Sequence, residues 1–164
     1  MTRQNILTVS ADLINHDLRN FLLEKGKPYI SDYKIDFNGG YIFAEAKLEV
    51  PTLGALSAQY QLKVIDLIFH PGRHVLTAEY QEDIKPTGGA MQSMLLKAAS
   101  LTGGSLLQKA LTMTTVSGLS ADEKKITLDF DQLGDLSQGA LKILGLEYID
   151  SRDGLLKLEY SLKL

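Results

Sequence analysis

The sequence predicts an α+β domain in which a strongly twisted, coiled antiparallel sheet of about seven strands wraps a long apolar helix, with an N-terminal amphipathic helix before it. Three observations lead to this class. Apolar and polar residues alternate through most of the chain, the segment around residue 100 is almost without charge, and apolar positions near the start recur with helical spacing. No linker or internal repeat divides the chain, so residues 1–164 are expected to form a single domain.

The N-terminal helix is expected to begin at Ser10, which can cap it, and to end at Gly26, which Pro28 follows. Its apolar positions share one face and are Leu13, Ile14, Leu18, Phe21 and Leu22. The opposite face is polar. We therefore expect this helix to cover an edge or an end of the sheet and not to run through its centre.

Four antiparallel strands are expected before residue 85. The first hairpin spans residues 33–50 and turns at "NGG", residues 38–40, which tolerate positive φ. The second spans residues 58–80 and turns at "HPGRH", residues 70–74. Within it the apolar phase slips by one residue near Asp66, which predicts a β-bulge and a strongly bent strand.

The stretch "MQSMLLKAASLTGGSLLQKAL", residues 91–111, carries only two charged side chains, Lys97 and Lys109. It predicts a helix over residues 90–113, about 35 Å long at 1.5 Å per residue, with a bend at Gly103-Gly104. A helix with so little charge must be covered on nearly every side.

Further strands are expected after this helix, at residues 126–130 and in a last hairpin of residues 140–149 and 155–164 around "SRDG". No sequence follows the last strand to cover its edge. That edge is therefore a candidate for pairing with another protein, although Lys157 and Lys163 would discourage promiscuous pairing.

Composition limits the function more than it defines it. A net charge of −3 and a pI near 5.6 give no excess of basic residues for a phosphate backbone, so nucleic acid is not an expected partner. The chain has no cysteine, which excludes disulfides, thiol nucleophiles and thiolate metal sites. The start of the chain has no apolar run of signal-peptide length, so a cytoplasmic location is expected unless a leader has been removed.

The sequence carries no complete catalytic or metal-binding motif. His70 and His74 have a metal-ligand spacing, but a Pro-Gly pair between them predicts a polar hairpin tip. "DFDQLGD", residues 129–135, begins like a calcium loop, yet Leu133 and Ala140 occupy two ligand positions. Hydrolase elbows, phosphate loops and dinucleotide fingerprints are absent. No catalytic residue, no metal, no cofactor and no enzymatic activity are therefore expected.

The order of elements resembles the tubular lipid-binding superfamily, which includes the halves of bactericidal permeability-increasing protein and several small bacterial lipoproteins. The likeness covers an amphipathic helix opening with "VSADLINHDLRNFL", four meandering strands, a long apolar helix and more strands. One local pattern, S-x-x-x-I-N-x-x-L from Ser10 to Leu18, accompanies it. The resemblance implies a coiled sheet around a long helix, with acyl chains held in the gap between them.

The first functional hypothesis is non-enzymatic binding of a lipid, a fatty acid or another elongated apolar molecule between the long helix and the inner face of the sheet. Flexible and small apolar side chains make an adaptable wall. The candidate lipid-binding residues are Met91, Met94, Leu95, Ala98, Leu106 and Leu107 on the helix and Leu62, Val64 and Leu48 on the sheet. Contact with a membrane would be transient, and the sequence assigns no oligomeric state.

The second hypothesis is a structural or interaction protein with a dry core, which acts by pairing a strand or a helix with a partner. Methionine and leucine at helical spacing are equally typical of a close-packed core. Size-exclusion chromatography and extraction of bound ligand would separate the two hypotheses.

Overall fold

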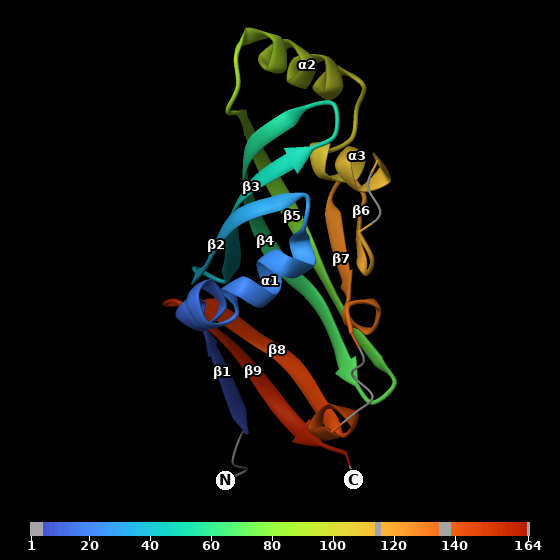
Figure 1. Ribbon diagram of the computed structural model, residues 1–164. Helices are drawn as coiled ribbons and strands as arrows, with labels where there is room; N and C mark the ends of the chain where they lie inside the picture. The colour runs from blue at the N-terminus through green and yellow to red at the C-terminus, as the bar shows by residue number, and fades with distance from the viewer. Residues whose placement is uncertain (1–4, 114–115, 135–138, 164) are drawn as a thin grey trace.

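The computed structural model describes residues 5–113, 116–134 and 139–163, and one antiparallel sheet dominates this part of the chain (Figure 1). The strands are β1 (Ile6–Ser10), β2 (Ile30–Asn38), β3 (Tyr41–Val50), β4 (Gly54–His70), β5 (Arg73–Pro86), β6 (Leu119–Ala121), β7 (Lys125–Asp129), β8 (Leu144–Arg152) and β9 (Leu155–Leu162). The helices are α1 (Arg19–Gly26), α2 (Ala90–Leu101) and α3 (Leu106–Met113), with a π-helical turn η1 (Leu13–Asp17) and 3-10 turns η2 (Phe130–Gln132) and η3 (Gly139–Lys142). Of the predicted positions, residues 1–4, Asp135 and Leu164 lie outside the described residues.

The predicted fold class is wrong in its central element, because the residues that the structure describes form no long apolar helix. Residues 90–113 form two short helices, α2 and α3. Between them Gly103 and Gly104 adopt φ values of 76° and 73°, a left-handed conformation that ends a right-handed helix. The glycine pair breaks the segment where only a bend was expected, and the antiparallel sheet has no long helix to wrap.

The two hairpins expected before residue 85 are confirmed as β2–β3 and β4–β5. The predicted bulge is confirmed too, since the register of β4 against β5 shifts between Val64 and Asp66. Ile65 is the residue without a partner in that ladder, so the exposed Asp66 faces away from the core.

The bulge divides the long strand β4 into two parts with different neighbours. Before it, β4 pairs with β3, and near its end Phe69 pairs with Leu146 of β8. The sheet order is β1-β9-β8-β4-β5-β7-β6, with β3 and β2 branching from β4. One bent strand therefore joins two groups of strands into one sheet.

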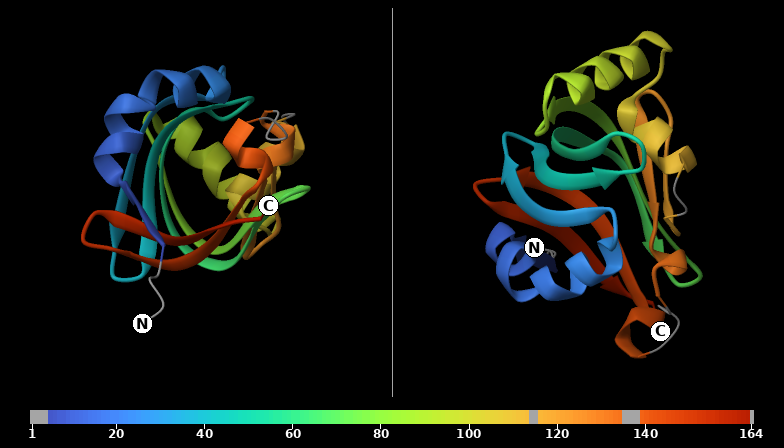
Figure 2. Two further views of the ribbon diagram at one scale, coloured as in Figure 1. Left: turned by 90° about the horizontal axis from the view of Figure 1, so that it is seen from below. Right: turned by 45° about the horizontal axis from the view of Figure 1, so that its top comes forward.

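The sheet is curled, and the tips of two hairpins that are distant in sequence bind each other (Figure 2). The Gly40 N–H donates to the Ser151 carbonyl at 2.8 Å, and the Gly154 N–H donates to the Phe37 carbonyl at 2.8 Å. Phe37 and Ser151 are both fully buried at this junction. The β2–β3 and β8–β9 hairpins are thereby held side by side.

The N-terminal segment differs from the single helix that was predicted. Residues Ile6–Ser10 form β1, which pairs antiparallel with β9. The edge of the last strand is therefore covered, and the expectation of an open edge at residues 155–164 is wrong. β1 and β9 lie far apart in the sequence, so no local pattern predicts that they pair.

The segment after β1 protects the free edge of β2, in agreement with the predicted role of the N-terminal helix. The Asn15 side-chain amide donates to the Ile35 carbonyl and accepts from the Ile35 N–H, both at 2.7 Å. Arg19 donates to the Tyr33 carbonyl at 3.0 Å and binds the Asp32 carboxylate, which lowers the pKa of Asp32. These bonds occupy backbone groups that an edge strand would otherwise expose.

The described part of the chain has a thin core. Its buried apolar side chains are Phe37, Val50, Leu56, Ala58, Ala78, Tyr80 and Leu158. Most other apolar side chains on the inner face of the sheet are half-buried, among them Ile42, Leu48 and Leu62. No described helix is long and apolar enough to span a bilayer.

Candidate functional site

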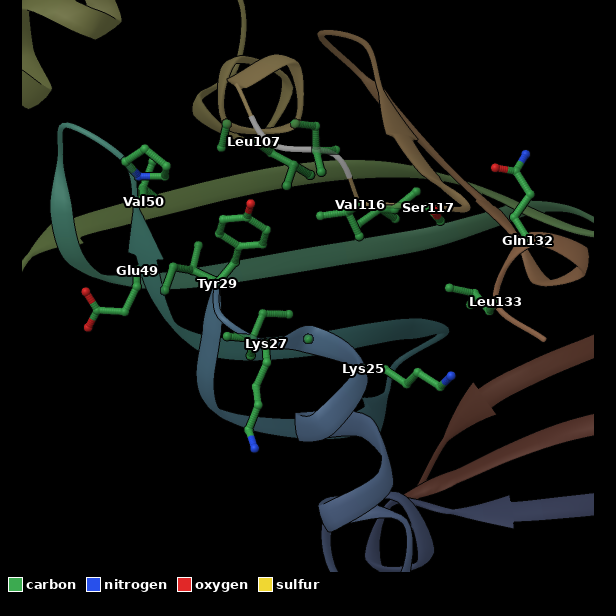
Figure 3. A pocket seen from close by; sticks show the side chains of 17 residues that line it. Lys25, Lys27, Tyr29, Glu49, Val50, Leu107, Val116, Ser117, Gln132 and Leu133 are labelled. Carbon is green, nitrogen blue, oxygen red and sulfur yellow. The ribbon is translucent and has the colours of Figure 1, made fainter.

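An apolar cavity of about 320 Å³ opens between the end of β3 and α3 (Figure 3). Its walls come from three regions of the chain: residues 25–30 with the end of β3, the inward side of α3, and residues 116–119 with 132–133. Cavities that hold small molecules commonly measure roughly 300–1,000 Å³, and an apolar cavity of about 150 Å³ can take up benzene. The volume therefore suits a small apolar molecule or part of a larger one.

The first wall is built by the segment that leads into β2 and by the end of β3. The Glu49 N–H donates to the Tyr29 carbonyl at 2.8 Å, which joins the two segments. Tyr29, Ile30, Leu48 and Val50 line the cavity from this side. Figure 3 shows the Tyr29 ring directed toward α3, so the ring spans part of the cavity.

The opposite wall is α3, which contributes Leu107, Ala110 and Leu111. The Glu82 carboxylate on β5 accepts from the backbone N–H groups of Leu106 at 2.6 Å and Leu107 at 3.1 Å. The first N–H groups of a helix lack partners within the helix, and a carboxylate there also meets the positive end of the helix dipole. Glu82 thus fixes α3 to the sheet.

A second group of bonds holds the same end of α3. Ser105 caps the helix by accepting from the Gln108 N–H at 2.9 Å. The Tyr80 hydroxyl contacts Ser105 Oγ and donates to the Asp122 carbonyl at 2.6 Å. Burial raises the pKa of Tyr80, so the phenol stays protonated as this donor. Tyr80 therefore links the sheet to α3 and to the loop before β7.

Charged side chains lie at the rim of the cavity. Lys27 Nζ is 2.6 Å from Glu24 Oε2, and in Figure 3 both the Lys27 ammonium and the Glu49 carboxylate point away from the cavity. Lys25 Nζ lies 5.7 Å from the centroid of the Phe21 ring and has no carboxylate partner among the described residues. Lys25 is thus the cation at this rim that can meet an anionic group of a ligand.

The predicted lipid-binding residues fall into three groups. Leu48 and Leu107 line the cavity from opposite walls. Leu106 lines a separate hollow beside α2, while Leu62 and Val64 lie on β4 and do not line the cavity. The others lie on the exposed face of α2: Met91, Met94, Leu95 and Ala98. These four residues lie outside the cavity because the break between α2 and α3 leaves α2 outside the sheet.

Several cavity residues were missed by the sequence analysis, namely Tyr29, Ile30, Leu111, Val116, Leu119 and Leu133. Tyr29 and Ile30 follow a proline and precede an alternating strand, so a local signal for an apolar contact was present. Leu111 lies within the predicted helix of residues 90–113 but was not chosen as a binding residue. Val116, Leu119 and Leu133 come from short segments whose apolar residues show no clear period. Only their arrangement in space brings them together.

His74 is not at a polar hairpin tip, as was predicted, but is 3% exposed on β5. Its Nδ1 lies 2.6 Å from Asp131 Oδ1, and its backbone N–H donates to Asp131 Oδ2 at 3.0 Å. The Phe69 ring packs against the His74 ring, with 4.5 Å between centroids, and the Phe130 ring packs against Phe69. The contact between His74 and Asp131 links the β4–β5 hairpin to η2.

His70 is exposed, and within the described ranges no group of three or more His, Cys, Asp or Glu side chains could hold a metal ion. In the calcium-like run, Asp129 accepts from the Asp131 N–H at 3.0 Å and caps η2.

Comparison with models of protein families, with curated proteins and with solved structures gives no match, so the resemblance to the tubular lipid-binding superfamily stays a prediction.

Proposed function

We propose that this protein binds the acyl chain of a fatty acid or a similar elongated apolar molecule in the cavity between β3 and α3, without catalysing a reaction. The observation that carries the proposal is the cavity itself, about 320 Å³ with leucine, isoleucine and valine side chains on opposite walls. Small-molecule sites are typically concave and mostly apolar, with a few polar groups that fix orientation.

Burial of the lining side chains supports a ligand over a dry core. Ile30, Leu48, Leu107, Leu111 and Leu133 are all only half-buried although they face the same space. Full burial of such a side chain stabilises a protein by about 1.5–3 kcal/mol relative to exposure. An apolar ligand would complete this burial, and its own apolar surface would leave water as well.

The rim suggests the kind of head group. Lys25 is one of the residues that line the cavity, and its ammonium has no carboxylate partner in the described part of the chain. A carboxylate or phosphate at the end of an acyl chain could bind there, because a charge-assisted hydrogen bond is stronger than a neutral one. The ligand class is therefore an apolar chain with an anionic end.

The proposal can be tested with a fatty acid that carries an environment-sensitive fluorophore. Leu107→Trp should weaken uptake of the probe by about tenfold, because the larger ring occupies the cavity. Met94→Trp is the matched control. Met94 is 72% exposed on α2, so the same change there should leave uptake unchanged.

The head-group assignment has a separate test. Lys25→Gln should weaken binding of a fatty acid by about tenfold but leave the fatty alcohol of equal length unaffected, since only the acid is charged. The proposal fails if wild-type protein takes up neither probe, or if Leu107→Trp and Met94→Trp behave alike. Equal effects of Lys25→Gln on acid and alcohol would reject the role of Lys25 alone.

A further inference from the structure

The helix α2 presents its apolar side to solvent. Met91, Met94 and Leu101 are 78%, 72% and 86% exposed, and Leu95 and Ala98 on the same side are exposed as well. These positions follow the spacing of one helical face. A helix on the surface of a soluble domain normally turns such a face inward, so α2 has the reverse orientation.

Polar contacts on the opposite face fix this orientation. The Gln92 side-chain amide donates to the carbonyls of Leu53 at 2.7 Å and Ala55 at 2.6 Å, and accepts from the Gly88 N–H at 2.5 Å. The bonds to Leu53 and Ala55 hold the start of α2 to the β3–β4 turn and the first residues of β4. Rotation of the helix to bury its apolar face would break both.

The charge of this region is opposite to that of the rest of the chain. Residues 84–121 contain three lysines, Lys85, Lys97 and Lys109, and no acidic residue. The segment is therefore +3 while the whole chain is −3, which leaves −6 on the remainder. Two acidic groups at the end of β5 are engaged, because Glu82 binds the start of α3 and Asp83 pairs with Lys85. Lys97, which flanks the apolar face, has no such partner among the described residues.

We propose that the outer face of α2 docks onto the surface of a bilayer that contains anionic lipids. Exposed apolar side chains flanked by basic ones bind at the level of the head groups, with electrostatic attraction to anionic lipids. Figure 1 shows α2 at one end of the molecule, where a flat surface can approach it without meeting the sheet. This inference does not rest on the proposed cavity ligand.

A second copy of the chain fits this face less well. Two molecules meeting through α2 would bring the unpaired Lys97 of each copy to the same interface, which disfavours association. A bilayer with anionic head groups has the complementary sign. The two occupants also make different predictions, because a dimer forms without lipid.

The test is co-sedimentation of the full chain with vesicles of phosphatidylcholine alone or of phosphatidylcholine and phosphatidylglycerol in equal parts. Binding is expected to the anionic vesicles, and to fall as salt is raised. Lys97→Gln should weaken it about fivefold, the contribution of one basic residue near such a surface. Met94→Glu should weaken it about tenfold or more, because a carboxylate replaces an apolar contact and is repelled.

Leu162→Glu is the matched control, since Leu162 is 57% exposed at the end of β9, far from α2 (Figure 1). It should bind vesicles like the wild type, and so should the cavity variant Leu107→Trp. The proposal is overturned if wild-type protein ignores anionic vesicles, or if Met94→Glu binds them as well as Leu162→Glu does. A concentration-dependent dimer that Met94→Glu abolishes, without vesicle binding, would assign the face to a second copy instead.

Discussion

The Glu82 carboxylate on β5 accepts a hydrogen bond from the backbone N–H of Leu106, the first residue of α3, at 2.6 Å. The other carboxylate oxygen accepts from the next N–H, of Leu107. A strand residue therefore supplies the cap that α3 needs, and the same contact places Leu107 on the wall of the cavity. Together with the Ser105 cap, Glu82 thus contributes both to the stability of the helix and to the shape of the site.

Replacing Glu82 should therefore both destabilise α3 and disturb the wall of the cavity. Glu82→Ala is expected to lower the free energy of unfolding by about 2 kcal/mol, because two N–H groups lose a charged acceptor. Glu82→Gln keeps one acceptor oxygen and should cost about half as much. Urea denaturation measures both changes, and uptake of the fatty-acid probe should fall in the same order.

The neighbouring Asp83 provides the control. It is exposed and lies 3.5 Å from Lys85, and such surface pairs contribute about 0–1 kcal/mol. If Asp83→Ala destabilises the protein as much as Glu82→Ala does, the capping role of Glu82 is wrong.

The sequence predicted the strands better than the helices. Strict alternation with "NGG" as a turn signal is sufficient for β2–β3, and the phase slip near Asp66 located the bulge in β4. The long helix failed because helical spacing continues across residues 90–113, while positive φ at Gly103 and Gly104 interrupts the backbone. Periodicity records faces and does not reveal whether two helical segments are continuous.

Contacts between segments that are far apart in the sequence could not be predicted, for a different reason. β1 is five residues long and pairs with β9 at the other end of the chain. The cavity likewise joins Tyr29, Leu111 and Leu133, which are far apart in sequence. Leu48 and Leu107 could be chosen because they are inward or apolar helical positions, but nothing local shows that they face each other.

Gly118 should be intolerant of a side chain. Its φ is 79°, and a Cβ placed there would lie 2.5 Å from the carbonyl oxygen of Asp129. Gly118→Ala is therefore expected to cost about 2 kcal/mol or more in thermal or urea unfolding. Gly39 also has a positive φ, but no atom lies within 4 Å of a Cβ placed there, so Gly39→Ala should cost about 1 kcal/mol. Equal losses in the two variants would mean that the contact with Asp129 has no effect.

The bulge in β4 can be tested through the unpaired residue itself. Deleting Ile65 would restore unbroken alternation and remove the bend that lets Phe69 pair with Leu146. The deletion should destabilise the protein by at least about 2 kcal/mol more than Ile65→Ala, which truncates a side chain that is already half exposed. Asp66→Ala should change stability by less than about 0.5 kcal/mol, since Asp66 is exposed. A deletion that is no worse than Ile65→Ala would show that the bend is dispensable.

The contact between His74 and Asp131 predicts how stability depends on pH. The hydrogen bond from the His74 side chain, with smaller contributions from its backbone N–H and its charge, lowers the pKa of Asp131 below 3.8. A carboxyl whose pKa is lower in the folded state stabilises the fold at pH values above its unfolded pKa. That contribution is lost as the pH falls through the folded value, since both states are then protonated. Asp131→Asn should therefore be less stable than wild type near neutral pH, with the difference shrinking below pH 3.8 in urea titrations.

The carboxyl titration of Asp131 gives a direct test by NMR. His74→Phe keeps an aromatic ring beside Phe69 but removes the Nδ1 partner, so the pKa of Asp131 should move back toward 3.8. The backbone N–H of residue 74 remains in the variant and still donates, so the return should be incomplete. If the titration of Asp131 is the same in both proteins, the histidine side chain is not the cause of the low pKa, and the link between the β4–β5 hairpin and η2 must depend on the backbone contact alone.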